Sequence, residues 1–371
     1  MALLIDGHCH PVLAADLDRA GFELACSEAD LPPPSGVSYL DSQLGLAVRR
    51  WCAPALGLPA HAPIEAYLER RAELGWSAAT AALMKKAGLS TLLVDTGLDD
   101  PSLIGLPELA SVAGATVHEV VRLERVAEGL AGQVSAEGFA DAFATALAQR
   151  VIGAVAVKSI IAYRYGLDIP AEHPSRAEVM SAAGRWLRGA DGRSASSRAG
   201  ERLTDPLLLR HILWAGVDTG LPVQLHTGFG DRDLRLPRAD PALARGFFEA
   251  TVSGGVPVVL LHAYPYHRSA GWLAQVYPHV HLDVGLTVGH LGLRADAVLA
   301  EFLELAPFGK VLFSTDAYQL PELYLVGAAQ FRHSLRRLLD GWVADGAMAR
   351  ADADRVTDQI GGTNACRVYG L

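Results

Sequence analysis

The sequence predicts an α/β fold, a (β/α)₈ barrel in which eight parallel strands alternate with helices. Short apolar runs bounded by Gly, Pro, Asp or His recur along the chain, and most precede a segment of helical periodicity. Continuous apolar runs such as VPVVLL and IGAVAV are typical of strands covered on both faces. Eight such runs are expected as strands: residues 3–9, 90–96, 116–123, 152–160, 221–227, 256–262, 279–285 and 310–315.

A doubly wound open sheet is the alternative arrangement of alternating strands and helices. Such a sheet usually carries a Gly-rich phosphate-binding turn after its first strand. Here the residues at that place read DGHCHP, so the barrel is favoured. A length of 371 residues fits one barrel with insertions, and we expect residues 1–371 to form a single domain.

A long segment separates the first two predicted strands. Residues 11–89 contain a Pro-rich stretch, LPPPSG, and helical patterns over residues 44–51 and 64–83. One crossover helix needs far fewer residues, so we expect a helical insertion at the mouth of the barrel, where loops build the substrate pocket. We also expect a polar loop over 189–204 and an amphipathic helix over 322–339.

Composition and charge narrow the class of protein. Hydrophobic residues make up 50% of the chain and charged residues 20%, which excludes intrinsic disorder. The formal net charge is −9 without a long basic run, so we expect a small-molecule substrate rather than nucleic acid or a membrane surface. We see neither an apolar run of the ~20 residues that span a bilayer nor a signal peptide. Cysteines without CxxC spacing fit a reducing compartment, and we expect a cytoplasmic protein.

Histidines and a carboxylate follow several predicted strands, at the edge where barrel enzymes carry their active sites. His8 and His10 end the first strand, and period-two alternation places both imidazoles on one side. His226 and His262 end the fifth and sixth strands, and Asp316 ends the eighth. Each residue alone has an ordinary alternative, a hydrogen-bonded core histidine or a carboxylate that caps a turn. Together they predict a site for a divalent metal ion, with zinc the best match to these ligands.

Lys158 stands at the end of an apolar fourth strand, GAVAVKSI, where an unpaired ammonium is costly. Three interpretations stay open. A lowered pKa would let the amine react with CO₂ and form a carbamate that bridges two metal ions. Alternatively, the ammonium binds a substrate carboxylate, or the side chain extends to the barrel rim. The site therefore holds one ion or two, depending on Lys158.

Several segments together resemble the amidohydrolase superfamily of metal-dependent barrel enzymes. The segments KSIIAYRYGL, LHAYPYHRSAGWLAQVYPHVHLDVGL, FSTDAYQLPELYLVGA and GTNACRVYGL are similar to an amidohydrolase-related domain that some plant and fungal proteins carry fused to a glutamine-synthetase-like domain. The resemblance covers essentially the whole chain and implies the barrel fold and a divalent-metal centre. The ligand order of the superfamily is matched by His8, His10, Lys158, His226, His262 and Asp316.

The resemblance implies hydrolysis of an amide C–N bond, with γ-glutamyl amides as attractive substrates. In this scheme, one or two divalent ions lower the pKa of bound water, and the resulting hydroxide attacks the carbonyl carbon. Asp316 accepts the water proton and passes it to the departing amine, while His262 or a metal ion stabilises the oxyanion. If two ions bind, the implied ligands are His8, His10 and Asp316 for one, and His226 and His262 for the other, bridged by carbamylated Lys158.

Two alternatives to hydrolysis stay open. The wider branch of the superfamily also contains decarboxylases and carbon–carbon lyases of aromatic acids, generally with one metal and no lysine on the fourth strand. Lys158 favours the hydrolase over these. The other alternative is a non-catalytic partner of a glutamine-synthetase-like enzyme, which the open ligand set argues against. A functional link to such an enzyme and a homo-oligomer are both compatible with the sequence.

Residues just beyond the ligand-bearing strands are candidates for substrate binding. Arginine forms a bidentate clamp on a carboxylate, and tyrosine presents both a ring and a hydroxyl. The alternatives are rim arginines paired with Asp or Glu, and tyrosines that pack their own loops. Asp283 is expected to support a metal-binding histidine, and Asp6 to be a partner at the barrel base. The five substrate-binding candidates are Arg164, Arg268, Tyr163, Tyr264 and Tyr318.

Overall fold

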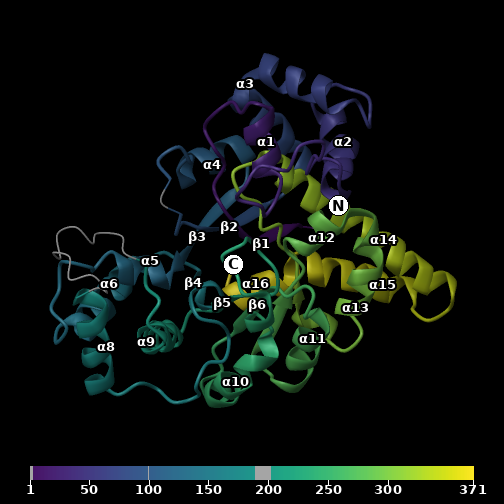
Figure 1. Ribbon diagram of the computed structural model, residues 1–371. Helices are drawn as coiled ribbons and strands as arrows, with labels where there is room; N and C mark the ends of the chain where they lie inside the picture. Colours follow the sequence, from purple (N-terminus) through teal and green to yellow (C-terminus); the bar gives the residue numbers. More distant parts are fainter. Residues whose placement is uncertain (1–2, 99, 189–201) are drawn as a thin grey trace.

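The computed structural model describes residues 3–98, 100–188 and 202–371. Within these residues, eight strands form one sheet in sequential order, β1 to β8 (Figure 1). Each strand pairs in parallel with the next, so each connection crosses over the sheet, and helices lie in these crossings. The strands are β1 (Ile5–Cys9), β2 (Thr91–Asp95), β3 (Thr116–Arg122), β4 (Ala156–Ser159), β5 (Val223–Thr227), β6 (Val258–His262), β7 (Val280–Asp283) and β8 (Val311–Leu312).

Hydrogen bonds between β1 and the residues that follow β8 close the sheet into a barrel. The Gly7 N–H donates to the Phe313 carbonyl over 3.0 Å, and the Asp316 N–H donates to the His8 carbonyl over 2.9 Å. The predicted (β/α)₈ barrel is confirmed, and each of the eight predicted runs contains an observed strand. The closing bonds also place Asp316 beside His8, although the two residues lie at opposite ends of the sequence.

Helices cover the outer face of the barrel (Figure 1). The helical patterns predicted over residues 44–51, 64–83 and 322–339 correspond to α2, α3 and α14. In the described residues the α-helices are α1 (Arg19–Ala25), α2 (Gln43–Ala55), α3 (Ile64–Ala87), α4 (Leu106–Ala113), α5 (Leu123–Glu128), α6 (Phe139–Arg150), α7 (Ile161–Arg164), α8 (Arg176–Arg188), α9 (Pro206–Asp218), α10 (Arg245–Thr251), α11 (His267–Val276), α12 (Thr287–Leu291), α13 (Ala295–Phe302), α14 (Pro321–Ala344), α15 (Arg350–Asp358) and α16 (Asn364–Tyr369).

The segment between β1 and β2 contains α1, α2 and α3. Two of these helices have a side-chain N-cap. The Asp18 side chain accepts a hydrogen bond from the Gly21 N–H, and the Ser42 side chain accepts one from the Gly45 N–H. Helix α3 bends at Gly75, whose φ of 75° suits glycine, and it packs against α14. Residues 11–89 therefore contain helices where they were predicted, and their interpretation as an insertion stays a prediction.

An apolar cluster fills the barrel interior, and side chains of α16 form part of it. Strand β5 contributes a polar side chain there, Gln224, whose amide nitrogen donates to the Gly7 carbonyl at 2.7 Å and to the Tyr369 hydroxyl at 2.9 Å. A buried amide nitrogen is tolerated because both of its hydrogens are paired. The buried members of the cluster are Ile5, Leu93, Val120, Ala156, Val259, Leu261, Leu312, Ala365, Val368 and Tyr369.

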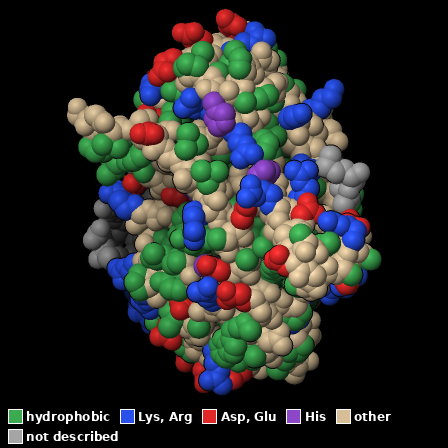
Figure 2. Space-filling view, turned by 90° about the vertical axis from the view of Figure 1, so that its right-hand side faces the viewer, with side chains coloured by type: hydrophobic (Ala, Val, Ile, Leu, Met, Phe, Trp, Pro, Cys, Tyr) green, Lys and Arg blue, Asp and Glu red, His purple; other side chains and the backbone are tan. Residues whose placement is uncertain are grey.

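Surface and loop features complete the fold. In the described residues, no helix is both long and apolar enough to cross a membrane. The polar loop predicted over residues 189–204 lies mostly outside the described residues, and only 202–204 are described, without regular structure. Figure 2 shows one face of the molecule, on which acidic, basic and apolar side chains are interspersed. Neither sign of charge dominates that face.

Candidate metal centre

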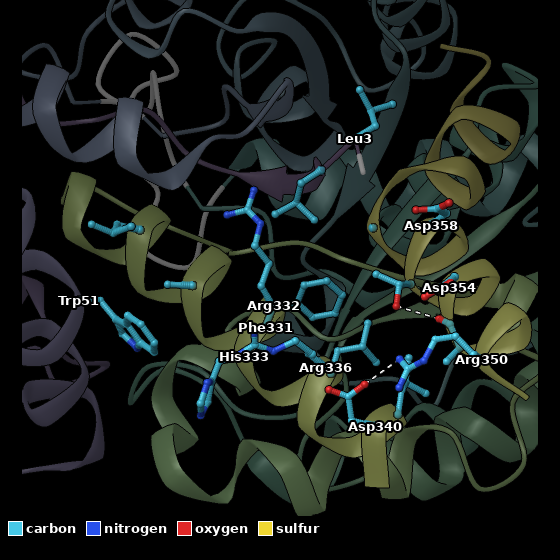
Figure 3. A pocket seen from close by; sticks show the side chains of 18 of the residues that line it. Leu3, Trp51, Phe331, Arg332, His333, Arg336, Asp340, Arg350, Asp354 and Asp358 are labelled. Carbon is cyan, nitrogen blue, oxygen red and sulfur yellow. Dashed lines mark hydrogen bonds and ion pairs between the residues drawn. The ribbon is translucent and has the colours of Figure 1, made fainter. Parts of the chain in front are cut away.

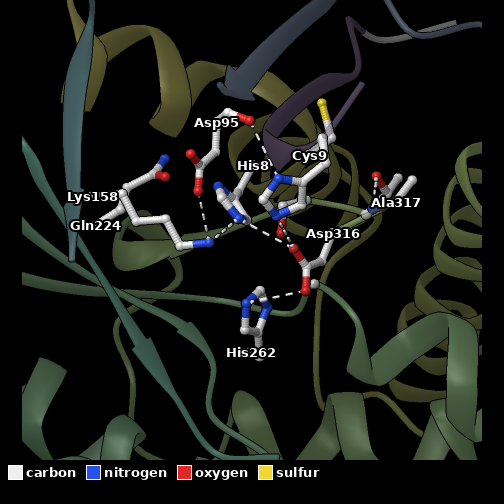
Figure 4. Close-up of polar contacts among 12 residues, drawn as sticks. His8, Cys9, Asp95, Lys158, Gln224, His262, Asp316 and Ala317 are labelled. Atoms are coloured by element: carbon white, nitrogen blue, oxygen red, sulfur yellow. Dashed lines mark hydrogen bonds and ion pairs between the residues drawn. The ribbon is translucent and has the colours of Figure 1, made fainter. Parts of the chain in front are cut away.

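The predicted ligands gather at the C-terminal edge of the barrel. Strands β1, β4, β5 and β6 carry four of them, His10 follows β1 directly, and Asp316 lies in the loop after β8. In Figure 4 the side chains of His8, Lys158 and His262 point toward Asp316. The six residues brought together are His8, His10, Lys158, His226, His262 and Asp316.

Asp316 lies at the centre of this group. Its Oδ1 is 3.2 Å from His8 Nε2 and 3.5 Å from His10 Nε2, and its Oδ2 is 3.3 Å from His262 Nε2. One ligand atom from each of His8, His10 and Asp316 lies within 4.8 Å of the others. A backbone bond from the His10 N–H to the Ala317 carbonyl, at 2.8 Å, fixes this arrangement. The spacing allows one cation to contact all three side chains.

His226 and His262 form the second half of the group. Their ring centroids are 4.9 Å apart, and the centroid of the Tyr163 ring lies 4.5 Å from that of His226. Both imidazoles are buried, with exposed fractions of 3% and 0%. They lie on adjacent strands whose register pairs His226 with Leu261, so their neighbourhood follows from the barrel ladder.

Several buried polar atoms of the group have no hydrogen-bond partner among the described residues. Buried nitrogen and oxygen atoms are almost always paired in proteins, so such atoms indicate a ligand or an ion. Imidazole nitrogens and a carboxylate oxygen are the ligands that zinc and similar divalent ions prefer. The residues therefore fit a divalent cation. The unpaired atoms are His8 Nδ1, His226 Nε2, His262 Nδ1 and Nε2, and Asp316 Oδ1.

The protonation states of the group suit metal ligands. Burial, assisted by the nearby Lys158 ammonium, lowers the pKa of His8 to about 3. Burial also lowers the pKa values of His226 and His262, so these imidazoles are neutral at pH 7. Burial alone would raise the pKa of Asp316, but His262 and the other imidazoles hold it well below its usual range. Neutral imidazoles and an ionised carboxylate are the forms that bind metal.

Lys158 makes an ion pair that the sequence analysis missed. Its Nζ lies 3.2 Å from Asp95 Oδ2 and 2.8 Å from His8 Nε2 (Figure 4). Arg122 also donates to Asp95 Oδ2, at 2.6 Å. Burial lowers the pKa of the Lys158 ammonium, and the Asp95 carboxylate opposes that shift. Asp95 and Arg122 end strands β2 and β3, so the position that singled out Lys158 could also have found them.

The backbone is strained at two of the candidate ligands, and hydrogen bonds to neighbouring aspartates support it. His262 and Asp316 have φ values of 68° and 51°, in a region that costs about 1–3 kcal/mol for residues other than glycine. Asp283 Oδ1 accepts a hydrogen bond from the His262 N–H at 2.7 Å. Asp6 accepts bonds from the Thr315 N–H at 2.8 Å and from its hydroxyl at 2.5 Å. These carboxylates hold the two strained positions, which is the supporting role expected of Asp283.

A pocket of ≈ 320 Å³ opens onto the group and is lined by His10, Lys158, His226 and Asp316. Three of the predicted substrate-binding residues also line it: Tyr163, Tyr318 and Arg164. Residues of the pocket wall that the sequence analysis missed are Glu28, Leu98, Arg122, Ile160, Arg202 and Asp231.

Two of the predicted substrate-binding residues, Arg268 and Tyr264, do not line this pocket. The Arg268 guanidinium is exposed on α11 and paired with Glu304 at 3.1 Å, and Arg268 does not line the pocket. Tyr264 also does not line it, and stacks on His267 with a centroid distance of 5.5 Å. Both residues follow β6, but the chain turns at its end and directs them away from the ligands. Arg268 is thus a rim arginine paired with an acidic residue, the alternative to substrate binding that the sequence left open.

A larger hollow of ≈ 780 Å³ lies at the other end of β1, between the start of that strand, α14 and α15 (Figure 3). Three of its charged groups already have partners: Arg350 pairs with Asp340 at 2.7 Å, and Arg332 donates to the Ala87 and Gly88 carbonyls. The grouping of metal-ligating side chains found among the described residues lies instead at the smaller pocket. Chemistry, rather than volume, therefore identifies the smaller pocket as the candidate site.

Comparisons with known proteins agree with this geometry. The family model described as Amidohydrolase matches residues 5–371. Protein fluG from Emericella nidulans is 33% identical over 225 residues, which cover 58% of this chain but only 26% of that protein. The chain thus corresponds to about a quarter of the length of fluG.

Solved structures share the fold. A presumed metal-dependent hydrolase from Lactobacillus casei is 27% identical, with a TM-score of 0.80 over 100% of this chain and 96% of that chain. Uronate isomerase from Thermotoga maritima is 13% identical, with a TM-score of 0.65 over 99% of this chain and 94% of that chain. The second likeness shows the barrel fold alone.

Proposed function

The chain belongs to the amidohydrolase family, and from that premise we propose that it is a metal-dependent hydrolase that cleaves an amide C–N bond in a small, carboxylate-bearing substrate. The observation that carries the proposal is the meeting of His8, His10 and Asp316 at the floor of a pocket whose wall includes arginines. Amides with a free carboxylate, of which γ-glutamyl amides are the leading class, suit such a wall.

The residues that would hold a divalent ion are His8, His10 and Asp316, with His226 and His262 beside them. When bound, the ion supplies polarisation of the scissile carbonyl and a lower pKa of the attacking water. Asp316 accepts a proton as the water oxygen bonds to the carbonyl carbon. When the C–N bond breaks, Asp316 returns that proton to the nitrogen, which leaves as a neutral amine. His262, 3.3 Å from Asp316, is placed to stabilise the oxyanion.

The contacts of Lys158 favour one ion over two. An ammonium at Nζ is stabilised by Asp95 at 3.2 Å, whereas a carbamate there would place a second anion beside that carboxylate. We therefore propose that Lys158 remains a cation facing the substrate. The alternative, a carbamate that bridges two ions, predicts about two equivalents of metal per chain.

A single ion keeps a second function in consideration. Mononuclear decarboxylases and lyases of small acids occur on the same barrel, and the pairing of Lys158 with Asp95 supports a mononuclear centre. The two functions release different products. Hydrolysis releases an amine, and decarboxylation releases CO₂.

The experiment that tests the proposal is metal analysis of protein purified without chelators, followed by a substrate panel. We expect about one equivalent of zinc or a similar ion per chain, and amine release from one or more γ-glutamyl amides or related amides. Two equivalents, with a carbamate seen by native mass spectrometry, would support the binuclear hydrolase. CO₂ release from aromatic acids without amine release would support the decarboxylase, and protein without metal or turnover would refute both.

A further inference from the structure

Two cations of the pocket wall share one buried carboxylate. The ladder between β3 and β4 pairs Arg122 with Lys158, and both residues line the pocket. Arg122 donates to Asp95 Oδ2 from Nη2 at 2.6 Å and from Nε at 3.0 Å, and Lys158 Nζ lies 3.2 Å from the same oxygen. Among the described residues, Asp95 is the carboxylate within ion-pair distance of these cations. The pair therefore carries one positive charge more than its partner balances.

The other arginines of the wall have one carboxylate each. Arg164 pairs with Glu128 at 2.9 Å, and Arg202 pairs with Asp233. A buried charge is costly unless an opposite charge balances it, and these two arginines are balanced within the chain. The unbalanced cation of the wall is therefore in the pair that shares Asp95, and an anionic group of a ligand would balance it.

The Arg122 side chain is held in a fixed position. Asp95 Oδ1 accepts a hydrogen bond from the Gly97 N–H at 2.8 Å, which orients the carboxylate that binds the guanidinium. Gly97 also leaves room for the arginine, because a Cβ at this position would lie 2.4 Å from Arg122 Cδ. The bonds to Asp95 use Nε and Nη2 and leave Nη1 outside this contact. A guanidinium fixed in this way loses little side-chain entropy when it binds a carboxylate.

The pair also lies next to the candidate metal ligands. His8 Nε2 is 2.8 Å from Lys158 Nζ and 3.2 Å from Asp316 Oδ1, so one imidazole separates the ammonium from the proposed proton acceptor. A carboxylate bound here would therefore be joined to the scissile carbonyl by only a few bonds. The acids Glu28 and Asp231 also line the pocket, but they belong to the connections that follow α1 and β5.

We propose that Arg122, together with Lys158, binds the free carboxylate of the substrate and determines the specificity of the enzyme. Asp95 is the positioning residue that holds both cations. The inference rests on the proposed function, because it assigns the substrate carboxylate to named residues of the same pocket. Neither Arg164 nor Arg268, the arginines that the sequence indicated, has this role. Amides without a free carboxylate are then poor substrates.

The test compares unreactive ligands that differ in one charged group. Succinate, glutarate and adipate are each paired with the monocarboxylate in which a methyl group replaces one carboxylate, namely butyrate, valerate and hexanoate. Binding to the metal-loaded protein is measured by calorimetry. We expect wild type to prefer the dicarboxylate in at least one pair. Arg122→Gln should weaken that dicarboxylate about 10- to 100-fold and leave its monocarboxylate unchanged, and Arg122→Lys, which keeps the charge, should weaken it less.

Arg150→Gln is the matched control. Arg150 pairs with Glu119, on the same strand as Arg122, at 2.6 Å, but it does not line the pocket. This variant should keep the wild-type preference. Thermal unfolding of each variant identifies loss of folding, and if Arg122→Gln does not fold, wild type and Arg122→Lys decide the test.

Several results would overturn the subsite. Equal affinity within every pair in wild type, or binding of neither member of any pair, would do so. An unchanged preference in Arg122→Gln would assign the carboxylate to another residue, and equal weakening of both members of a pair would indicate a structural role. Amine release from the amide panel is scored separately. Ligand discrimination without hydrolysis would keep the subsite and refute the hydrolase, and hydrolysis without discrimination would do the reverse.

Discussion

The two ends of the barrel interior differ in the side chains that fill them. At the base, apolar side chains pack against α16 around Gln224, whose amide nitrogen donates two hydrogen bonds and whose Oε1 has no hydrogen-bond partner among the described residues. At the C-terminal edge, buried polar atoms without a hydrogen-bond partner gather on metal-ligating side chains, those of His226, His262 and Asp316. Unpaired buried atoms cost stability unless a ligand satisfies them. The base is therefore built for stability and the edge for binding, so variants at the two ends should affect different measurements.

The largest expected effect is on turnover at the edge. Asp316→Asn keeps the shape of the side chain but removes the group that accepts the proton, so we expect kcat to fall by about 10²- to 10⁴-fold. Because Asp316 is also one of the residues that would hold the ion, turnover of the variant is compared with that of wild type at saturating metal concentration. The measurement is a steady-state assay paired with metal analysis of the same preparation. Near-normal turnover in this variant would contradict the assigned role of Asp316.

A base variant should show the opposite pattern. Leu93→Ala leaves a cavity in the interior cluster, and we expect the free energy of unfolding to fall by about 2–5 kcal/mol. Turnover of the folded fraction should stay within about twofold of wild type, because Leu93 belongs to the interior cluster and does not line the pocket. Denaturant unfolding and the same assay measure the two quantities. A large loss of kcat in Leu93→Ala would show that the two ends are coupled.

The gain in stability on metal binding should depend on residues of the C-terminal edge and not on residues of the base. At a free metal concentration of 100 times Kd, we expect a gain of about 2.7 kcal/mol in the free energy of unfolding. His10→Asn should lose most of this gain, whereas Leu93→Ala should keep it. Thermal unfolding with metal and with chelator measures the difference. An unchanged metal effect in His10→Asn would place the ion elsewhere.

Acid should lower the free energy of unfolding by protonating two buried histidines, His279 and His281. Burial lowers the pKa values of His279 and His281 to about 4, from a usual value near 6.5. The unfolded chain therefore binds more protons than the folded one between about pH 6.5 and 4. The free energy of unfolding should fall as the pH drops through that window, by up to about 1.4 kcal/mol per pH unit for each histidine. His281→Asn should flatten the fall in chelator-treated protein, and an unchanged slope would refute this origin.

The smallest expected effect is on stability, at the hydrogen bond between α16 and the barrel interior. Tyr369→Phe removes the hydroxyl that accepts from Gln224 at 2.9 Å, and we expect a loss of about 1 kcal/mol in the free energy of unfolding. Turnover should be unaffected. A stability equal to that of wild type would show that the Gln224 amide finds another acceptor.

The barrel and the gathering of the six candidate residues at its edge could be predicted because both follow from local patterns. Apolar runs mark the strands, and a histidine or aspartate at the end of a run marks the edge. The supporting pairs could not be predicted in the same way. The partnership of Asp95 with Lys158 depends on two strands that meet only in the folded barrel, and Glu28 reaches the pocket from a long connection. The position of Arg268 outside the pocket could not be predicted either, because the direction of its helix does not follow from the preceding strand.

The contact of Asp6 with Thr315 joins residues 309 positions apart, next to ligands of the candidate site. At a synthesis rate of ~5–20 residues per second, roughly 15 to 60 s separate the appearance of these two residues from the ribosome. His8 and His10 are therefore made long before Asp316, and the complete ligand set exists only after the last strand has closed the barrel. If the site holds a metal as proposed, its selection is a property of the finished chain and of the ions available to it, not of the nascent segment that carries the first two histidines.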